Sequence, residues 1–186
     1  MPVTRTAEQE ALDRLLSQTA RGDQAAFAEL YRCSSSRLFG VCLRMLRERG
    51  ETEEVLQETW ITVWHRAATF DASRASAITW LTTLARNKAI DRLRQRREQP
   101  LDDPALVNTL VDEDPSPAAD AENSQEYRRL RDCLDQLEPQ QRGSVRAAFF
   151  SGATYNELAT RCQVPLGTMK SWIRRSLLQL RTCLDT

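Results

Sequence analysis

The sequence has few of the residues from which catalytic and metal sites are usually built. Its 186 residues include a single histidine, His65, and only six glycines, and aromatic residues make up 6%. The five cysteines form no CxxC pair, so the clustered ligands of a zinc site are missing. No glycine-rich phosphate-binding loop appears, and one histidine leaves most acid–base schemes to carboxylates alone. We therefore expect no catalytic residue, no metal site and no cofactor.

Long hydrophobic runs are also lacking. No apolar stretch follows Met1, so we expect no signal peptide, and none approaches the ~20 apolar residues of a membrane span. We therefore expect a cytoplasmic protein. In that compartment an odd number of cysteines predicts reduced, mostly buried thiols, and the absence of a paired motif argues against a redox role. The cysteines are Cys33, Cys42, Cys133, Cys162 and Cys183.

The abundant residues favour helices and divide the chain into two bodies. Ala, Leu, Arg, Glu and Gln dominate, which predicts an all-α protein of two small helical domains. Residues 98–126 hold nine acidic residues, no lysine or arginine, and four of the seven prolines. That stretch has no sustained helical period, so we predict a flexible acidic linker. The predicted segments are a domain over 1–97, a linker over 98–125 and a domain over 126–186.

Four helices are predicted in the first domain. The first runs from about Glu8 to residues 21–22. Asp23 is a candidate N-cap for the second, which we expect over 24–46, with Gly50 ending that segment. The third and fourth helices are expected over 51–67 and 77–97, with a loop between them.

The third and fourth helices differ in charge. The third has a core stripe of Leu56, Trp60, Val63 and Trp64, and its other face is acidic. An ordinary solvated surface is the simplest explanation of that face. The fourth helix has six basic and two acidic residues over 81–100. With Trp80 on its polar side, it fits a surface for nucleic acid, although Trp80 suits a helix junction in the core at least as well.

Residues 154–175 have the pattern of a helix-turn-helix. Thr154 and Glu157 make a capping box, residues 162–164 form the turn, and Pro165 suits the first position of the second helix. The outward residues of that helix offer hydrogen bonds to bases and positive charge to phosphates. A packing αα-hairpin with a basic rim is the alternative, and Gln163 stands where a turn glycine is usual. The predicted DNA-binding residues are Thr168, Lys170, Ser171, Arg174 and Arg175.

Three blocks of the sequence resemble the extracytoplasmic-function (ECF) class of bacterial sigma factors. They are ETEEVLQETWITVW, WLTTLARNKAIDRLRQRR and LEPQQRGSVRAAFFSGATYNELATRCQVPLGTMKSWIRRSLLQLR. Their order and spacing match the family over about 23–97 and 126–184. The chain departs from the family pattern at Glu51 and Glu54, which are usually Asp, at Met169, which replaces a β-branched residue, and at Gly143. A glycine within a helix predicts a kink or a weak point there.

The resemblance implies a role for each surface. The acidic face would dock on the clamp helices of the largest polymerase subunit through Glu51, Glu53, Glu54, Gln57 and Glu58. The loop and the basic helix would bind the −10 element and a flipped base through Ser73, Arg74, Arg86, Asn87 and Arg94. The helix-turn-helix would read the −35 element and touch the polymerase flap. The linker would thread the polymerase channels, and an anti-sigma factor, often membrane-tethered in the family, would hold the protein inactive.

Two other classes of protein compete with this interpretation. A stand-alone helix-turn-helix regulator would need a ligand pocket or a dimer seam within residues 1–97, where the sequence shows an acidic and a basic face instead. An enzyme would need one of the missing catalytic patterns. On the sigma-factor interpretation the chain does no chemistry, and the polymerase makes the bonds.

Overall fold

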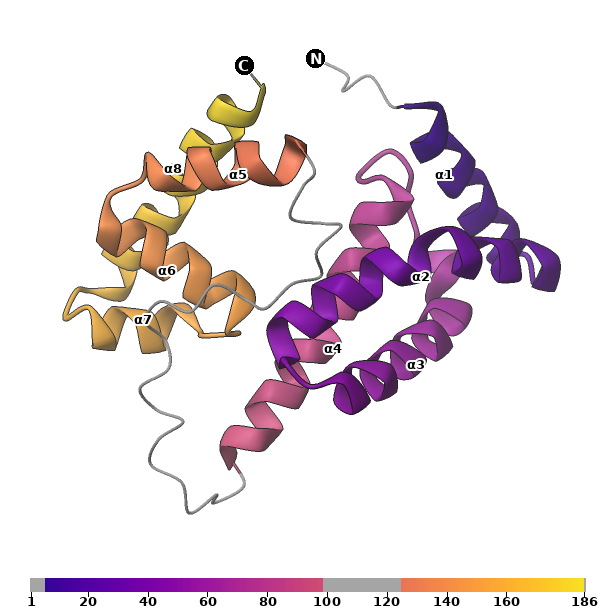
Figure 1. Ribbon diagram of the computed structural model, residues 1–186, viewed down its shortest axis with the longest axis horizontal. Coiled ribbons are helices and arrows are strands. Elements are labelled where there is room, and N and C mark those ends of the chain that lie inside the picture. The colour runs from indigo at the N-terminus through magenta and orange to yellow at the C-terminus, as the bar shows by residue number, and fades with distance from the viewer. Residues whose placement is uncertain (1–5, 99–124, 186) are drawn as a thin grey trace. The chain divides into compact units, whose positions relative to one another are not determined.

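The computed structural model describes residues 6–98 and 125–185, which belong to two compact units (Figure 1). All regular elements of the described residues are helical and none is a strand, so the all-α prediction is confirmed. The predicted linker lies outside the described residues, except that residue 98 ends one helix and residue 125 begins the next. None of the described helices is long and apolar enough to cross a bilayer.

The first unit consists of α1 (Ala7–Thr19), α2 (Gln24–Leu46), α3 (Arg49–Arg66), the short 3-10 helix η1 (Ala67–Thr69) and α4 (Ala77–Glu98). As predicted, the Asp23 side chain caps α2 by accepting from the Ala26 N–H at 3.0 Å. The second helix has its predicted bounds, but the prediction that Gly50 ends the segment is wrong. The chain leaves α2 through Arg47, whose φ is +59°, and Gly50 lies in the first turn of α3. The reason is Glu48, whose carboxylate accepts from the Gly50 N–H at 2.8 Å and so starts α3 earlier.

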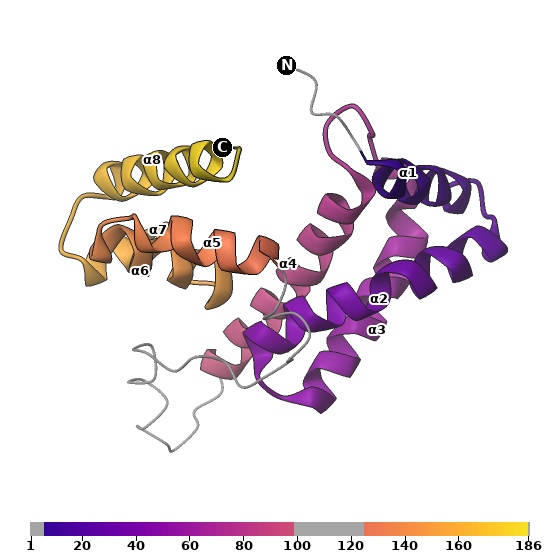
Figure 2. The same cartoon turned by 45° about the horizontal axis from the view of Figure 1, so that its top comes forward.

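One hydrophobic core joins these helices. α2, α3 and α4 pack against one another, and α1 packs on α2 and α4 (Figures 1 and 2). Leu16, Leu30, Leu38 and Leu81 are fully buried, and each such side chain stabilises the fold by about 1.5–3 kcal/mol. Leu56, Trp60 and Val63 of the predicted stripe of the third helix face this core, whereas Trp64 is half-buried and lies outside it. Trp80 is half-buried against it and packs edge-on to Phe70, which is the helix-junction role.

The second unit consists of α5 (Gln125–Asp135), α6 (Pro139–Phe150), α7 (Tyr155–Arg161) and α8 (Leu166–Asp185). The predicted capping box is present, because Thr154 and Glu157 satisfy each other's backbone N–H groups. Gln163 adopts a left-handed φ of +54°, the conformation for which a turn glycine is usual. Pro165 precedes α8 instead of opening it, and its carbonyl accepts from the Met169 N–H at 3.1 Å. The helix α6 continues unbroken through Gly143.

A disulfide joins the ends of the second unit. Cys133 of α5 is bonded to Cys183 of α8, and their Cα atoms are 5.9 Å apart. The prediction that all cysteines are reduced is therefore wrong for this pair. The two residues are 50 positions apart, so no short motif marks them, and only the packing of α5 against α8 brings them together. Among the free cysteines Cys42 is buried, whereas Cys33 is exposed.

Candidate functional site

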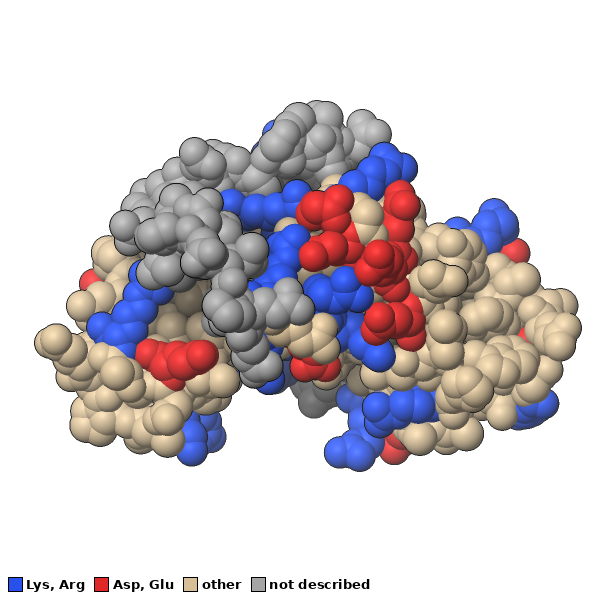
Figure 3. Space-filling model, turned by 90° about the horizontal axis from the view of Figure 1, so that it is seen from below, with Lys and Arg blue, Asp and Glu red and all other residues tan. Residues whose placement is uncertain are grey.

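The acidic face of α3 splits into two sets, and the first set pairs with α4. Because Glu51, Glu54 and Glu58 recur at spacings of three and four, they lie on one side of the helix. Opposite them, three basic residues of α4 recur every four positions. Figure 3 shows acidic and basic side chains gathered side by side on this unit. We call these six residues the α3–α4 ion-pair ladder: Glu51, Glu54, Glu58, Lys88, Arg92 and Arg96.

The contacts in this ladder run antiparallel. Arg96 pairs with Glu51 at 2.7 Å, Arg92 with Glu54 at 2.9 Å, and Lys88 with Glu58 at 3.4 Å. Arg92 also reaches Glu58 at 3.4 Å. The hydrogen bond from Arg92 to Glu54 raises the pKa of the guanidinium above its ordinary value. Carboxylates that were predicted to bind a partner are thus already engaged within the unit.

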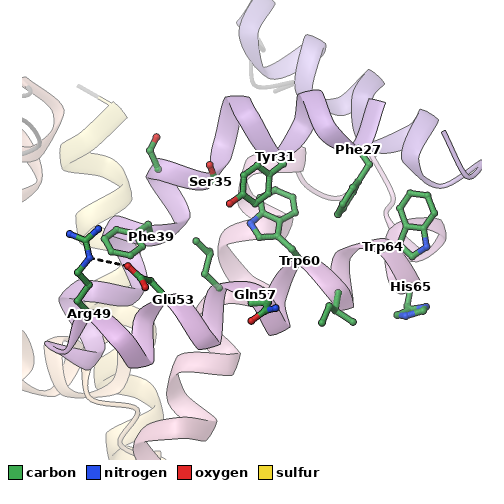
Figure 4. Close-up of a pocket in the computed structure, with 13 residues that line it drawn as sticks. Phe27, Tyr31, Ser35, Phe39, Arg49, Glu53, Gln57, Trp60, Trp64 and His65 are labelled. Carbon is green, nitrogen blue, oxygen red and sulfur yellow. Dashed lines mark hydrogen bonds and ion pairs between the residues drawn. The ribbon is translucent and has the colours of Figure 1, made fainter. Parts of the chain in front are cut away.

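The second set of α3 residues lines a shallow groove between α2 and α3. The groove has a volume of about 900 Å³, and Glu53 and Gln57 lie along it (Figure 4). Its wall is aromatic, because the Tyr31 and Trp60 rings are 5.0 Å apart, and those of Phe27 and Trp64 are 5.2 Å apart. Arg49 closes one end by pairing with Glu53 at 2.9 Å. Of the five predicted polymerase contacts, only Glu53 and Gln57 therefore face this groove.

The indole of Trp60 is a further feature of the groove. The side chain is 5% exposed, and its buried N–H has no hydrogen-bond acceptor among the described residues. A buried donor without an acceptor costs free energy. The groove therefore combines apolar surface with an unused donor in its wall.

On α4 two of the predicted −10 residues point away from the ladder. Asn87 and Arg94 are seven positions apart, two helical turns, and both are exposed. At 100° per residue their face lies about 150° around α4 from the basic side chains of the ladder. Arg86 is half-buried between these two faces. The structure therefore divides the basic residues of α4 into a set that holds α3 and a set that borders solvent.

The loop before α4 carries the other predicted −10 residues. Ser73 and Arg74 are both exposed. Asp71 organises the loop, because its carboxylate accepts from the Ser73 N–H at 2.9 Å and from the Ser73 hydroxyl at 2.7 Å. These bonds, the hydroxyl first, lower the pKa of Asp71. The Ser73 hydroxyl proton is therefore already committed, and the hydroxyl oxygen is left as an acceptor.

The outer face of α8 forms a basic surface on the second unit. Met169 and Ile173 are buried in the core, whereas Lys170, Arg174 and Arg175 are exposed. None of these three basic residues forms an ion pair within residues 125–185. The other two predicted residues differ from them, since Thr168 is half-buried and the hydroxyl of Ser171 donates to the Gly167 carbonyl at 2.9 Å. The free cations make this face suited to a polyanion.

Known proteins match both units in this order. Residues 30–99 match the family model described as Sigma-70 region 2, and residues 127–180 match that of Sigma-70, region 4. These are the parts of a sigma factor, the class of transcription initiation factor that directs RNA polymerase to promoters. The chain is also similar to the ECF RNA polymerase sigma factor SigK of Mycobacterium tuberculosis, with 39% identity over 175 residues, 94% of each chain. The Mycobacterium ulcerans SigK is 38% identical over the same shares.

A solved structure is similar as well. It is Rhodobacter sphaeroides SigE in complex with the anti-sigma ChrR, at 37% identity, 95% coverage of this chain, 97% of that chain and a TM-score of 0.45. The relatives of known sequence identify the family, and the chain belongs to the ECF RNA polymerase sigma factors. The stand-alone regulator is accordingly not favoured.

Two features of the surfaces escaped the sequence analysis. The α2 wall of the groove was missed, although the spacing of four between Phe27 and Tyr31 places them on one side of a helix. The ion-pair ladder was missed because each helix was considered alone. Complementary charges at matching spacings on two adjacent helices were a usable signal for it.

Proposed function

We propose that the chain binds core RNA polymerase through its first unit and brings it to promoters whose −10 and −35 elements are bound by the first and second units. The observation that carries this proposal is that α4 and α8 each have two distinct faces. Each helix packs one face into its own core and leaves polar or basic residues exposed on the other. As in sigma factors generally, the polymerase performs the chemistry, so we assign no catalytic role to the chain.

Polymerase docking centres, in this proposal, on the groove between α2 and α3. Glu53 and Gln57 line it, and its aromatic wall offers apolar surface to a helix of the clamp of the largest subunit. Glu54 and Glu58 stay half or more exposed despite their ion pairs, at 65% and 50% of their side chains, and flank the same contact. Glu51, at 22%, serves mainly to hold α4.

Recognition of the −10 element is assigned to the loop and the open face of α4. Ser73 and Arg74 are exposed in the loop, and Asn87 and Arg94 lie on the open face of α4. With Arg86 they supply a hydroxyl acceptor, an amide and guanidinium groups. Those groups fit a flipped base and its neighbouring phosphates. Their contacts must offset the stacking energy that a flipped base loses, which is on the order of a few kcal/mol.

Recognition of the −35 element is assigned to α8. Thr168, Lys170 and Ser171 lie in its first turns, where a recognition helix meets base edges. Arg174 and Arg175 follow on the exposed side and suit phosphates. The unit would also contact the polymerase flap.

The remaining parts of the proposal concern organisation and control. Residues 1–97 and 126–186 act as region 2 and region 4, and 98–125 as the acidic linker between them. We propose that an anti-sigma factor covers these surfaces until a signal arrives, and that this partner is tethered to a membrane. Two solved structures of similar proteins are complexes with an anti-sigma factor. The chain would work in the cytoplasm, where the polymerase and the chromosome are.

The proposal is tested by run-off transcription. Purified protein is mixed with sigma-free bacterial core polymerase and genomic fragments of the source organism, alongside Glu53→Lys and the charge-reversal control Glu10→Lys, an exposed residue of α1. We expect specific transcripts with the wild type and the control, and neither transcripts nor co-migration with core for Glu53→Lys. If the wild type binds DNA alone but neither co-migrates with core nor supports transcription, the regulator becomes the better account.

A further inference from the structure

A carboxylate of α1 caps the helix that carries the predicted −10 residues. Asp13 is only 8% exposed, and its Oδ1 atom accepts from the Ala77 N–H at 2.5 Å, across 64 residues of sequence. Ala77 is the first residue of α4. The contact therefore ties the middle of α1 to the point where the loop ends and α4 begins.

The bond answers a need of the α4 backbone. The first N–H groups of a helix have no acceptor within the helix, and a negative charge there is favoured by the helix dipole. Ser76 meets part of this need locally, because its hydroxyl accepts from the Thr79 N–H at 3.4 Å. The Ala77 N–H is buried and depends on Asp13. A carboxylate is costly to bury unless it is hydrogen-bonded, so the two groups hold each other in place.

The same bond fixes one end of the loop. At its other end, Phe70 packs against Trp80 with ring centroids 6.0 Å apart, and η1 beside it contacts α1. In between, the Asp71 carboxylate orders the backbone at Ser73. The exposed Ser73 and Arg74 thus lie between two fixed points of the chain. One is the polar bond from Asp13 of α1, and the other is the apolar contact between Phe70 and Trp80.

We propose that Asp13 is a positioning residue for −10 recognition: it touches no DNA, and it holds the loop and the first turn of α4 in the arrangement that captures the promoter base. This inference rests on the proposed function, and it adds α1 to the parts that determine promoter selectivity. It predicts that loss of the Asp13 acceptor loosens the loop and lowers discrimination among −10 sequences, while polymerase binding through the α2–α3 groove is retained.

The test compares three full-length variants with the wild type. Asp13→Ala removes the acceptor, whereas Asp13→Asn keeps an oxygen that caps a helix almost as well. Ser17→Ala is the matched control, because among the described residues the Ser17 hydroxyl bonds within α1, to the Asp13 carbonyl at 2.9 Å. Two properties are measured: hydrogen exchange of residues 71–79 in the isolated protein, and the ratio of transcription from a wild-type-selected promoter to that from copies with single −10 substitutions.

We expect Asp13→Ala to speed exchange over residues 71–79 and to reduce the transcription ratio, each by roughly fivefold, the size of effect that loss of one helix cap produces in an equilibrium. Asp13→Asn and Ser17→Ala should stay within about twofold of the wild type. Simple loss of folded protein lowers transcription from all promoters equally and leaves the ratio unchanged.

Each contrary outcome has a distinct meaning. Unchanged exchange in Asp13→Ala overturns the inference, whatever the transcription result. Faster exchange with an unchanged ratio also overturns it, because the bond would then be structural alone. If the wild type directs no transcription, the proposed function fails, and the exchange data still decide whether Asp13 orders the loop.

Discussion

The Arg92 guanidinium of α4 donates to the Glu54 carboxylate of α3 at 2.9 Å, so two residues that sequence patterns assign to different partners bind each other. Glu54 belongs to the acidic face predicted to meet the polymerase, and Arg92 to the basic helix predicted to meet DNA. Their pairing leaves one fewer free positive charge on α4 and one fewer free negative charge on α3. A protein that should bind promoters only together with polymerase benefits from a smaller exposed basic surface, because non-specific DNA binding grows with the number of free cations.

The first prediction concerns this pair. Glu54→Lys should lower the thermal midpoint of the first unit by roughly 4 °C, because it replaces an ion pair worth about 1 kcal/mol or less by a repulsion. The loss should shrink in 1 M salt, where such charges are screened. The measurement is thermal unfolding at low and high salt, followed by circular dichroism.

Two further variants separate the ladder from the groove. The charge swap Glu54→Arg with Arg92→Glu should restore only part of the midpoint, since it rebuilds this pair in reverse but turns the contact of position 92 with Glu58 into a repulsion. Glu53→Lys should leave the midpoint nearly unchanged, because its partner Arg49 lies on the same helix and both side chains are more than half exposed. Equal decreases of the midpoint in Glu53→Lys and Glu54→Lys would mean that the α3–α4 ion-pair ladder stabilises the unit no more than the exposed pair within α3 does.

Periodicity was enough to predict most of the fold. Apolar residues at helical spacing identified core positions, as Leu56, Trp60 and Val63 of α3 show. Local capping chemistry fixed the start of α2 at Asp23 and of α7 at Thr154. These features are encoded within a few residues of each other, which is why a single sequence reveals them.

The features that the sequence did not reveal depend on packing between helices. The Cys133–Cys183 disulfide, the Asp13 cap and the ion-pair ladder join residues 30 or more positions apart. Likewise, the acidic face of α3 looked uniform until α2 and α4 were placed on its two sides. The roles assigned to Glu53, Asn87 and Arg174 remain predictions, because they concern contacts with partners.

The second prediction concerns Gly143 in the middle of α6. A Cβ atom added there would meet no atom within 4 Å, and the residue is exposed with an unbroken helix around it. Gly143→Ala should therefore stabilise the second unit by up to about 1 kcal/mol, the helix-propensity difference between the two residues. Chemical denaturation measures the change, and a loss of stability would show that the glycine is required by packing.

The third prediction concerns the disulfide between α5 and α8. It closes a loop across a sequence separation of 50, and chain-entropy models assign such a bridge about 4 kcal/mol. Reduction should therefore speed hydrogen exchange throughout the second unit and leave the first unit unchanged. The double variant Cys133→Ala, Cys183→Ala is the control, since it should no longer respond to reductant. Equal exchange in the oxidised and reduced wild type would mean that the helices hold together without the bond.

The last prediction is a pH dependence that originates at Cys42. Burial raises the pKa of this thiol from 9.0 to about 11, and the thiol lies 3.8 Å from the Ala85 carbonyl that accepts from it. The unfolded chain therefore loses the proton first as pH rises. The contribution of Cys42 to stability is complete below pH 9 and is lost as the pH approaches 11.

We therefore expect Cys42 alone to lower the free energy of unfolding of the first unit by up to about 1.4 kcal/mol per pH unit between pH 9 and pH 11. Cys42→Ala removes this slope, although it lowers stability at every pH because a buried side chain is truncated. Urea titrations at several pH values between 8 and 11 give both slopes. Tyrosine and lysine titrate in the same range in both proteins, so the difference between the two slopes isolates the thiol. Equal slopes in the wild type and Cys42→Ala would mean that Cys42 ionises alike in the folded and unfolded chain. Water would then reach the contact between α2 and α4, despite the packing of Cys42 in the core.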